Sequence, residues 1–214
     1  MPKLLYFGLH GRALKIRMLC KHANIAIDDE NPEKGDWKAW PDLKAEFPER
    51  GGLPWFVNND GKVFTQSDAI LKTLALQAGY KCDDIWQQYE SEWAFETAND
   101  FMKMDGILKP FFSPAFGGPA ATDEECTKSL GLLCQWFDKL QARYSDGRAY
   151  SAGDKITAAD FALVSADVGM WSNPHTKSGN FAATVKAELA KRDKVQAIID
   201  KVKGENGLTE WIAE

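Results

Sequence analysis

The spacing of hydrophobic residues changes along the first 80 positions, and each spacing is typical of one kind of element. Short apolar runs at residues 3–7 and 25–29 flank a stretch whose apolar side chains recur every third or fourth position. That spacing predicts an amphipathic helix from Arg12, and the short runs predict strands. The apolar positions of this helix are Ala13, Ile16, Leu19, Cys20 and Ala23. A strand, a helix and a strand at this spacing form a parallel, right-handed βαβ unit.

A hairpin and a further helix follow. Residues 55–57 and 63–65 are short apolar runs separated by an Asn-Asp-Gly turn, which predicts two antiparallel strands. The polar residues 66–68 then begin a helix that we expect to reach about Ala78, with Ser67 as its N-cap. The first part of the chain therefore predicts a βαβ–ββα arrangement.

The rest of the chain carries helical spacing only. Residues 85–112 predict one long helical segment, which stops at a Pro- and Gly-rich loop at residues 113–119. Residues 126–144 predict another helix, because their apolar positions lie alternately four and three apart. Thr157 and Asp160 match a capping box at a helix start, and we expect this box to be purely structural.

This change in pattern places a domain boundary near residue 80. We expect one domain at residues 1–79, a linker at residues 80–84 and an all-α helical domain at residues 85–214. Within the first domain, residues 36–48 contain two tryptophans and two prolines, which predicts an irregular loop with one helical turn.

Composition and charge exclude several classes of protein. Of the 214 residues, 44% are apolar and 27% are charged, as in ordinary soluble proteins. No apolar run approaches the ~20 residues of a membrane span, and the N-terminus lacks the features of a signal peptide, so we expect a cytoplasmic protein. A net charge of −5 without a basic block argues against a nucleic acid or a membrane as partner.

The cysteines and histidines do not have the spacing of a metal site. No two of the four cysteines form a CxxC motif, and the three histidines are scattered. Cys20 and Cys126 lie on apolar stripes, which favours buried thiols over disulfides or metal ligands. We therefore expect no metal.

The stretch from Gly51 to Ile70 has the features of an anion site. The first turn of a helix presents unpaired N–H groups and the positive end of the helix dipole, so the helix start at Ser67 suits a carboxylate. Leu53-Pro54 before a strand is the usual setting for a cis peptide, which would let the Leu53 backbone pair with an extended ligand. The stretch thus predicts a site for a small acidic peptide. The alternative interpretation is an ordinary loop before a strand, followed by an ordinary helix start.

Four motifs together resemble the cytosolic glutathione transferases across the whole chain. The start of the chain looks like the tyrosine-type members, and closest to the sigma class, which includes prostaglandin D isomerases and lens S-crystallins. The motifs are Tyr6 to Arg17 (YFGLHGRALKIR), Leu53-Pro54 before the third strand, Gln66 to Ile70 (QSDAI) opening a helix, and Ile156 to Phe161 (ITAADF). The resemblance implies an α/β thioredoxin-like domain followed by an all-α domain, and a dimeric, detoxifying glutathione transferase.

In this family Tyr6 would donate a hydrogen bond to the glutathione sulfur, and Arg12 would add a positive charge near the thiolate. A thiol with a pKa of about 8.5 is only ~3% ionised at pH 7, and lowering that pKa by about two units needs ~2.7 kcal/mol. A less basic thiolate is also a weaker nucleophile, so ionisation alone raises the reaction rate only a few-fold. Positioning of the electrophile over the sulfur must supply the rest of the rate enhancement. Without the resemblance, Tyr6 would be interpreted as a core aromatic residue.

The resemblance also implies how glutathione is held. Its γ-glutamyl end would contact Gln66 and Ser67, its cysteinyl backbone would pair with Leu53, and Asp100 would reach across a two-fold dimer. A solvated acidic face with Glu92 and Glu96 is the alternative for Asp100. The other expected contacts are Phe7, Arg12, Trp37, Lys44, Gly52 and Pro54.

Two parts of this site depart from the family or are poorly defined. Gly52 stands where relatives usually carry Lys or Gln, and the spacing from Trp37 to Lys44 is longer than usual, so Trp40 could replace Trp37. The apolar electrophile would lie against Phe7, Met102, Leu108 and Phe112, although such residues are usually core.

Three activities fit these residues. The first is conjugation of the glutathione thiolate, with glutathione as co-substrate, to a small apolar electrophile. The second is a glutathione-dependent isomerase or peroxidase on the same site. The third is a non-catalytic, crystallin-like structural or binding protein.

Overall fold

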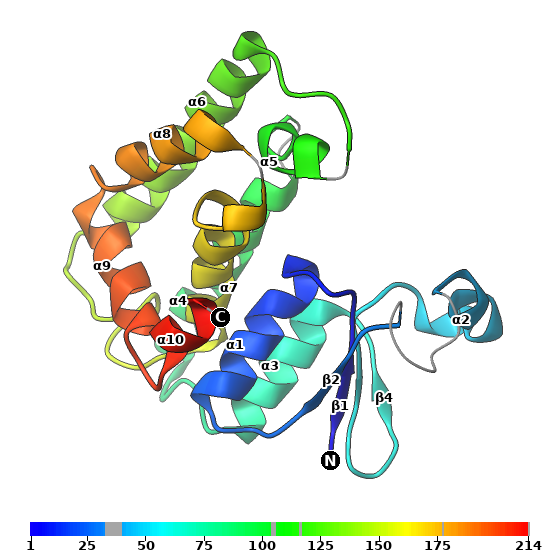
Figure 1. Cartoon of the computed structure of the whole chain (residues 1–214). Coiled ribbons are helices and arrows are strands. Elements are labelled where there is room, and N and C mark those ends of the chain that lie inside the picture. The colour runs from blue at the N-terminus through cyan, green and yellow to red at the C-terminus, as the bar shows by residue number, and fades with distance from the viewer. Residues whose placement is uncertain (33–39, 104–105, 116, 177, 214) are drawn as a thin grey trace. The chain divides into compact units, whose positions relative to one another are not determined.

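A computed structural model describes residues 1–32, 40–103, 106–115, 117–176 and 178–213 of the chain. The chain divides into two compact units (Figure 1). The N-terminal unit comprises Met1–Tyr80 with Asn206–Leu208, and the C-terminal unit comprises Lys81–Glu205 with Thr209–Glu214.

A four-stranded mixed sheet forms the centre of the N-terminal unit. In the sheet β1 pairs in parallel with β2 and antiparallel with β3, and β3 pairs antiparallel with β4, so the strand order is β2-β1-β3-β4. The strands are β1 (Lys3–Leu5), β2 (Asp28–Glu30), β3 (Trp55–Val57) and β4 (Val63–Phe64). The predicted βαβ–ββα arrangement is confirmed, although β1 and β2 are shorter than predicted.

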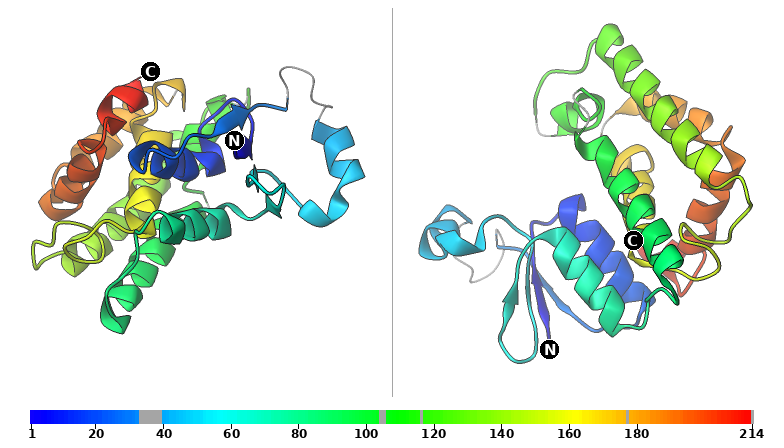
Figure 2. Two further views of the ribbon diagram at one scale, coloured as in Figure 1. Left: turned by 90° about the horizontal axis from the view of Figure 1, so that it is seen from below. Right: turned by 180° about the vertical axis from the view of Figure 1, so that it is seen from behind.

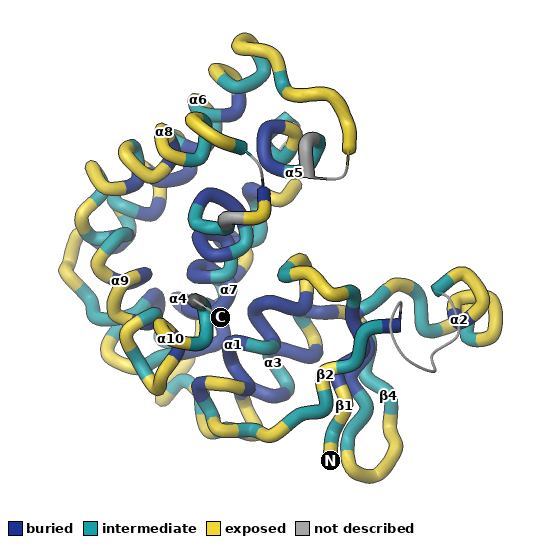
Figure 3. Tube along the Cα trace, in the orientation of Figure 1, coloured by how far each residue is buried: buried dark blue, intermediate teal, exposed yellow. Residues whose placement is uncertain are grey.

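Helices α1 (Leu14–His22) and α3 (Ser67–Gln77) pack side by side on the sheet (Figures 1 and 2). Most of the predicted apolar stripe, Ala13, Ile16, Leu19 and Cys20, is buried, whereas Ala23 just beyond α1 is partly buried. Figure 3 shows the mainly buried tube of α1. A 3-10 turn, Gly11–Ala13, precedes α1, so the α-helix begins two residues later than the predicted Arg12.

The segment before β3 holds more regular structure than predicted. Helix α2 (Trp40–Glu46) and a 3-10 turn at Pro48–Arg50 take the place of one helical turn, while residues 36–39 of the predicted loop lie outside the described residues. Trp55 forms a small apolar cluster with Leu5 and Leu43. This cluster explains the regularity, since Leu43 of α2 is buried in it and Phe47, which precedes the 3-10 turn, packs against Trp55.

The C-terminal unit is built of helices. Its aromatic core includes Trp136, Phe137 and Trp171. The α-helices are α4 (Ile85–Asp100), α5 (Lys109–Ala115), α6 (Asp123–Arg143), α7 (Ala158–Ala166), α8 (Gly179–Leu189), α9 (Asp193–Lys203) and α10 (Leu208–Ala213), with shorter helical turns at Phe101–Lys103, Asp167–Trp171 and Pro174–Thr176.

The single long helix predicted at residues 85–112 is wrong. Helix α4 ends at Asp100, a 3-10 turn follows, and α5 starts only at Lys109. Gly106, at a φ of 86°, lies in the left-handed region, which no α-helix contains. Helix α5 also continues to Ala115, into the predicted loop at residues 113–119.

The predicted capping box of α7 is confirmed. The Asp160 carboxylate accepts hydrogen bonds from the backbone N–H groups of Thr157 and Ser151, both at 2.7 Å. These bonds satisfy the start of the helix, which fits a structural role.

All four cysteines are free thiols. Cys20 is buried, and burial raises its pKa to about 12, whereas Cys126 is only partly buried. The expectation that Cys126 is buried is therefore wrong, because it lies at the edge of the apolar stripe of α6. The described residues contain no group of His, Cys, Asp and Glu side chains that could hold a metal, and none of their helices is long and apolar enough to cross a membrane.

Candidate functional site

Several of the predicted site residues meet at one edge of the sheet. Leu5, the last residue of β1, pairs with Trp55, the first residue of β3, so Tyr6 and Pro54 come at the same edge. Helix α3 begins beside α1 at this end, because Lys15 forms an ion pair with Asp68. We call this region, made of Tyr6, Gly11, Arg12, Leu53, Pro54 and Ser67, the tyrosine edge.

The Tyr6 hydroxyl is held by the start of the first helix. The Tyr6 side chain is buried, and its oxygen accepts a hydrogen bond from the backbone N–H of Arg12 at 3.0 Å. A hydroxyl that accepts one hydrogen bond keeps its own proton to donate elsewhere. The Arg12 side chain is exposed, so its backbone N–H, and not its charge, contacts the tyrosine.

Gly11 is required at this edge, although it entered the sequence analysis only as part of the motif from Tyr6 to Arg17. Its φ is 39°, and a Cβ at this position would collide with the hydroxyl of Tyr6 and with Leu9. A side chain would therefore be strained by the backbone and would displace the hydroxyl.

Arg17 fixes the segment that follows Tyr6, and its role was not predicted. It contacts Asp29 through Nε at 2.5 Å and Nη2 at 3.0 Å, and donates to the Leu9 carbonyl at 2.6 Å. Its guanidinium also lies 5.7 Å from the centroid of the Tyr6 ring. The sequence showed only that the opening motif contains two arginines. It could not show the contact of Arg17 with Asp29, because Asp29 lies on a separate strand, β2.

The Leu53-Pro54 peptide bond is cis, as predicted. Neither the N–H nor the C=O of Leu53 forms a hydrogen bond with another described residue. Leu53 precedes β3, and Gly52 before it is exposed. The backbone of Leu53 thus offers one donor and one acceptor for an added strand.

The predicted N-cap of α3 is wrong by one residue. Ser67 is the first helical residue and is buried, while Gln66 occupies the N-cap position with a φ of 67°. The carbonyl of Gln66 accepts the hydrogen bond of Ile70, so the helix ladder starts one residue earlier than the sequence pattern implies. A left-handed non-glycine residue is strained, and such strain clusters at ligand sites.

A buried lysine adds charge behind the start of α3. Lys15 is 7% exposed, and burial lowers its pKa, although the negative charge of Asp68 opposes that shift. Sequence reasoning missed Lys15, because its burial depends on the packing of α1 against α3.

The residues expected at the glycine end of glutathione are only partly placed. Trp37 lies outside the described residues, and Lys44 is exposed on α2. Trp40 packs against Phe7 and Trp55, with ring centroids 6.1 Å and 5.7 Å away. No side chain at Gly52 can supply a charge.

A further cation, which was not predicted, precedes Gly52. The Arg50 guanidinium lies 3.8 Å from the centroid of the Phe47 ring and 5.1 Å from that of Trp55. These rings hold it beside the start of β3. An arginine two residues before Gly52 was visible in the sequence as a possible replacement.

The remaining predicted residues belong to the C-terminal unit. Asp100 lies 3.6 Å from Lys139 and 4.0 Å from Lys103, so cations of its own unit face it. Met102 is 37% exposed, and Leu108 and Phe112 are partly buried.

Comparison with known proteins agrees with this geometry. A family model described as "Glutathione S-transferase, N-terminal domain" matches residues 2–75. Glutathione S-transferase 1 of Ascaris suum is 25% identical over 99% of this chain and 95% of its own length. Residues 2–75 therefore belong to the glutathione S-transferase N-terminal domain family, and the chain is similar to glutathione S-transferases along its length. Hematopoietic prostaglandin D synthase of Homo sapiens is 28% identical over 74% of each chain.

Solved structures of the family share the fold. The glutathione S-transferase Blo t 8 has a TM-score of 0.74 at 26% identity, covering 99% of this chain and 92% of its own. Prostaglandin synthase D of Nilaparvata lugens has a TM-score of 0.69 at 23% identity, covering 100% of this chain and 98% of its own. The predicted fold, family and transferase class are thus confirmed, and the prostaglandin synthases support the resemblance to the sigma class.

Proposed function

We propose that this glutathione transferase uses Tyr6 to stabilise the thiolate of glutathione, which attacks a small apolar electrophile. The hydrogen bond from the Arg12 N–H to the Tyr6 oxygen carries this proposal. It fixes the position of the hydroxyl and, because hydrogen bonds in series strengthen each other, makes the phenol a better donor. Its proton is then available to the sulfur.

Glutathione lies along the tyrosine edge in this proposal. The N–H and C=O of Leu53, which form no hydrogen bond with another described residue, pair with its cysteinyl backbone. Its γ-glutamyl carboxylate lies at the start of α3, against Gln66 and Ser67, where the N–H groups of the first turn attract an anion. Phe7 and the exposed Arg12 border the sulfur.

We assign the glycine carboxylate to a cation near Gly52. Arg50 and Lys44 are the candidates among the described residues, and the stacked position of Arg50 favours it. Trp37 and Gly52 remain predicted contacts, with Trp40 as the alternative tryptophan.

The electrophile and the biological role are proposed from the family. An apolar substrate would contact Phe7, Met102, Leu108 and Phe112, in a protein that works in detoxification in the cytoplasm. Relatives named prostaglandin D synthase favour one alternative on the same site, a glutathione-dependent isomerase.

We further propose that the protein is a homodimer in which Asp100 approaches the partner's glutathione. An exposed aromatic face on α4 supports this, since Ile85, Trp86 and Tyr89 are 85%, 65% and 49% exposed. In a two-fold dimer, each subunit covers such a face of the other subunit. Sedimentation of the parent chain tests it, and a monomer at micromolar concentration contradicts it.

Tyr6→Phe and Ser67→Ala test the assignment of the tyrosine edge together. With a generic aryl halide at pH 7, Tyr6→Phe should lower turnover about tenfold and keep the Kd of glutathione within a few-fold. The loss should shrink at alkaline pH, where the thiol ionises unaided. Ser67→Ala should instead raise the Kd of glutathione. Equal turnover of Tyr6→Phe and parent at pH 7 removes Tyr6 from the mechanism.

A further inference from the structure

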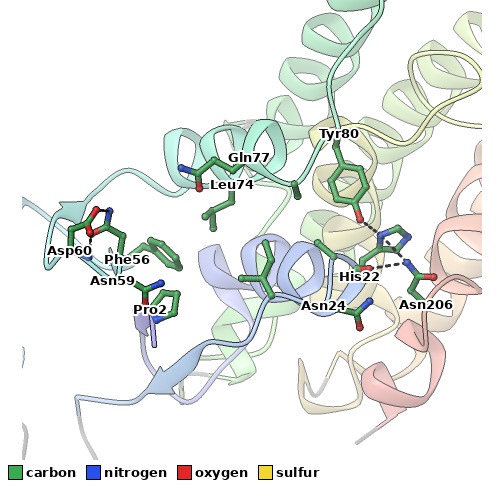
Figure 4. Close-up of a pocket in the computed structure, with 14 residues that line it drawn as sticks. Pro2, His22, Asn24, Phe56, Asn59, Asp60, Leu74, Gln77, Tyr80 and Asn206 are labelled. Carbon is green, nitrogen blue, oxygen red and sulfur yellow. Dashed lines mark hydrogen bonds between the residues drawn. The ribbon is translucent and has the colours of Figure 1, made fainter.

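A cavity lies in the N-terminal unit, at the ends of the two helices that begin at the tyrosine edge. It has a volume of about 720 Å³, within the range of small-molecule sites. All of its lining residues belong to this unit (Figure 4). We call it the carboxamide cavity, after the five Asn and Gln residues among its polar lining, Asn24, Asn58, Asn59, Gln77 and Asn206.

One wall of the carboxamide cavity is fixed by hydrogen bonds. Nδ1 of the buried His22 lies 2.6 Å from the Tyr80 hydroxyl, and Asn206 Nδ2 donates to the His22 carbonyl at 2.8 Å (Figure 4). These contacts join the end of α1, Tyr80 three residues beyond the end of α3, and Asn206 from a distant part of the chain. A wall fixed in this way holds its polar groups in place for a ligand.

Three carboxamides of the lining are available to a ligand. The side chains of Asn24, Asn59 and Gln77 form no hydrogen bond with another described residue, and all three are exposed. Asn24 has a φ of 54°, a conformation that glycine adopts more easily. The apolar part of the lining includes Pro2, Ile25 and the largely buried Phe56 and Leu74.

The charges around this cavity disfavour an anion. The last carbonyl groups of α1 and α3 point to this end and carry the negative ends of their helix dipoles. Asp60 adds a carboxylate, and the lining residues that the structure describes include no Lys or Arg. Glutathione and its conjugates are acidic, so they do not fit here.

We propose that the carboxamide cavity binds a neutral, planar heterocycle whose edge carries N–H and C=O groups. Carboxamides pair with such an edge as both donors and acceptors, and the flat face would cover Phe56 and Leu74. This site is separate from the tyrosine edge and does not depend on the proposed transferase mechanism.

Riboflavin is a suitable probe, because it is neutral, planar and fluorescent, and flavin mononucleotide is its phosphorylated counterpart. With the full-length chain, riboflavin should bind with a Kd below about 1 mM. Flavin mononucleotide should bind at least about tenfold more weakly, and Asp60→Asn should narrow that difference. Saturating glutathione should not displace riboflavin.

Variants then locate the binding. Asn24→Gly keeps the left-handed backbone and Gln77→Ala keeps the helix, so neither should unfold the chain, yet together they should weaken riboflavin about tenfold. Leu76→Ala, an exposed neighbour on the same helix, is the control and should leave the Kd unchanged. In NMR spectra recorded during a riboflavin titration, the changes in backbone amide chemical shifts should cluster at residues 22–25, 58–60 and 77–80. Absence of saturable binding, an unchanged Kd in the double variant, or shifts centred on Tyr6 would overturn the proposal.

Discussion

The two ends of helices α1 and α3 present opposite charge to a ligand. At the tyrosine edge both helices begin, so the positive ends of their dipoles attract anions, and Lys15 and Arg12 add positive charge. At the carboxamide cavity both helices end, their carbonyl groups face outward, and Asp60 is the acidic residue of the lining. The same pair of parallel helices therefore creates one end suited to a peptide with carboxylates and one end suited to neutral molecules.

The ends also differ in how their polar groups are used. At the tyrosine edge the key hydroxyl, that of Tyr6, is already held by a backbone N–H and by the close approach of Gly11. At the carboxamide cavity the fixed groups form the wall, and the available groups are exposed side chains. A site held by the backbone suits catalysis, which needs fixed geometry, whereas exposed carboxamides suit binding alone.

The largest effect is expected from Gly11→Ala. The new Cβ would displace the Tyr6 hydroxyl from the Arg12 N–H, so turnover at pH 7 should fall at least about tenfold, as in Tyr6→Phe. The positive φ should also lower the free energy of unfolding by about 1 kcal/mol. Steady-state assays with an aryl halide and chemical denaturation measure the two effects.

Gly79→Ala is the matched control for Gly11→Ala. Gly79 has a φ of 87°, but a Cβ there would meet nothing within 4 Å. The Gly79→Ala variant should therefore show a similar decrease in the free energy of unfolding and keep the turnover of the parent. Gly11→Ala added to Tyr6→Phe should have little further effect on turnover, since both remove the same hydrogen bond. If Gly11→Ala alone keeps parental turnover, the position of the hydroxyl does not matter.

Lys15→Met should have an intermediate effect, on glutathione affinity. Lys15→Met removes the positive charge that faces Asp68 at the start of α3, so the local charge becomes more negative and repels the γ-glutamyl carboxylate. The Kd of glutathione should rise about fivefold, as calorimetry would show, and the double variant Lys15→Met/Asp68→Asn should recover most of the loss. A parental Kd in the single variant would mean that this end does not bind the anion.

Lys15 also gives the chain a defined pH dependence. Burial lowers the pKa of Lys15 below its usual 10.5, so the folded chain holds this proton less tightly than the unfolded chain. The free energy of unfolding of the parent, relative to Lys15→Met, should then rise with pH between the lowered pKa and 10.5. Denaturation at a series of alkaline pH values measures this difference, and a difference that falls with pH contradicts the assignment.

The order of elements in the N-terminal unit could be predicted because each one has a clear local signal. The β3 run at Trp55, the Asn-Asp-Gly turn and the apolar stripe of α1 each specify one element. Breaks without such a signal were missed: the residues from α4 to α5 have continuous helical spacing, yet α4 gives way to a 3-10 turn at Phe101–Lys103 and Gly106 is left-handed. The capping box of α6, Thr122 with Glu125, was visible in the sequence and was overlooked.

The site was predictable where it rests on motifs and not where it rests on packing. Tyr6 and Leu53-Pro54 were found through the motifs that contain them. Gly11 and Arg17 were missed as site residues, because their importance lies in contacts to Tyr6 and to Asp29 across the fold. The carboxamide cavity has no sequence signal at all, since its residues come from five separate segments.

The smallest effect is expected at the glycine end of glutathione. Here Arg50→Ala and Lys44→Ala test which of the two cations binds the glycine carboxylate. Arg50 is held by the rings of Phe47 and Trp55, whereas Lys44 is exposed on α2. An ordered cation loses less side-chain freedom on binding a carboxylate, so Arg50→Ala should raise the Kd of glutathione about threefold and Lys44→Ala less than about twofold. The reverse order would assign the glycine carboxylate to α2 and leave Arg50 with a packing role. γ-Glutamylcysteine, which lacks the glycine, should bind the parent and Arg50→Ala equally, because the contact that distinguishes them is gone.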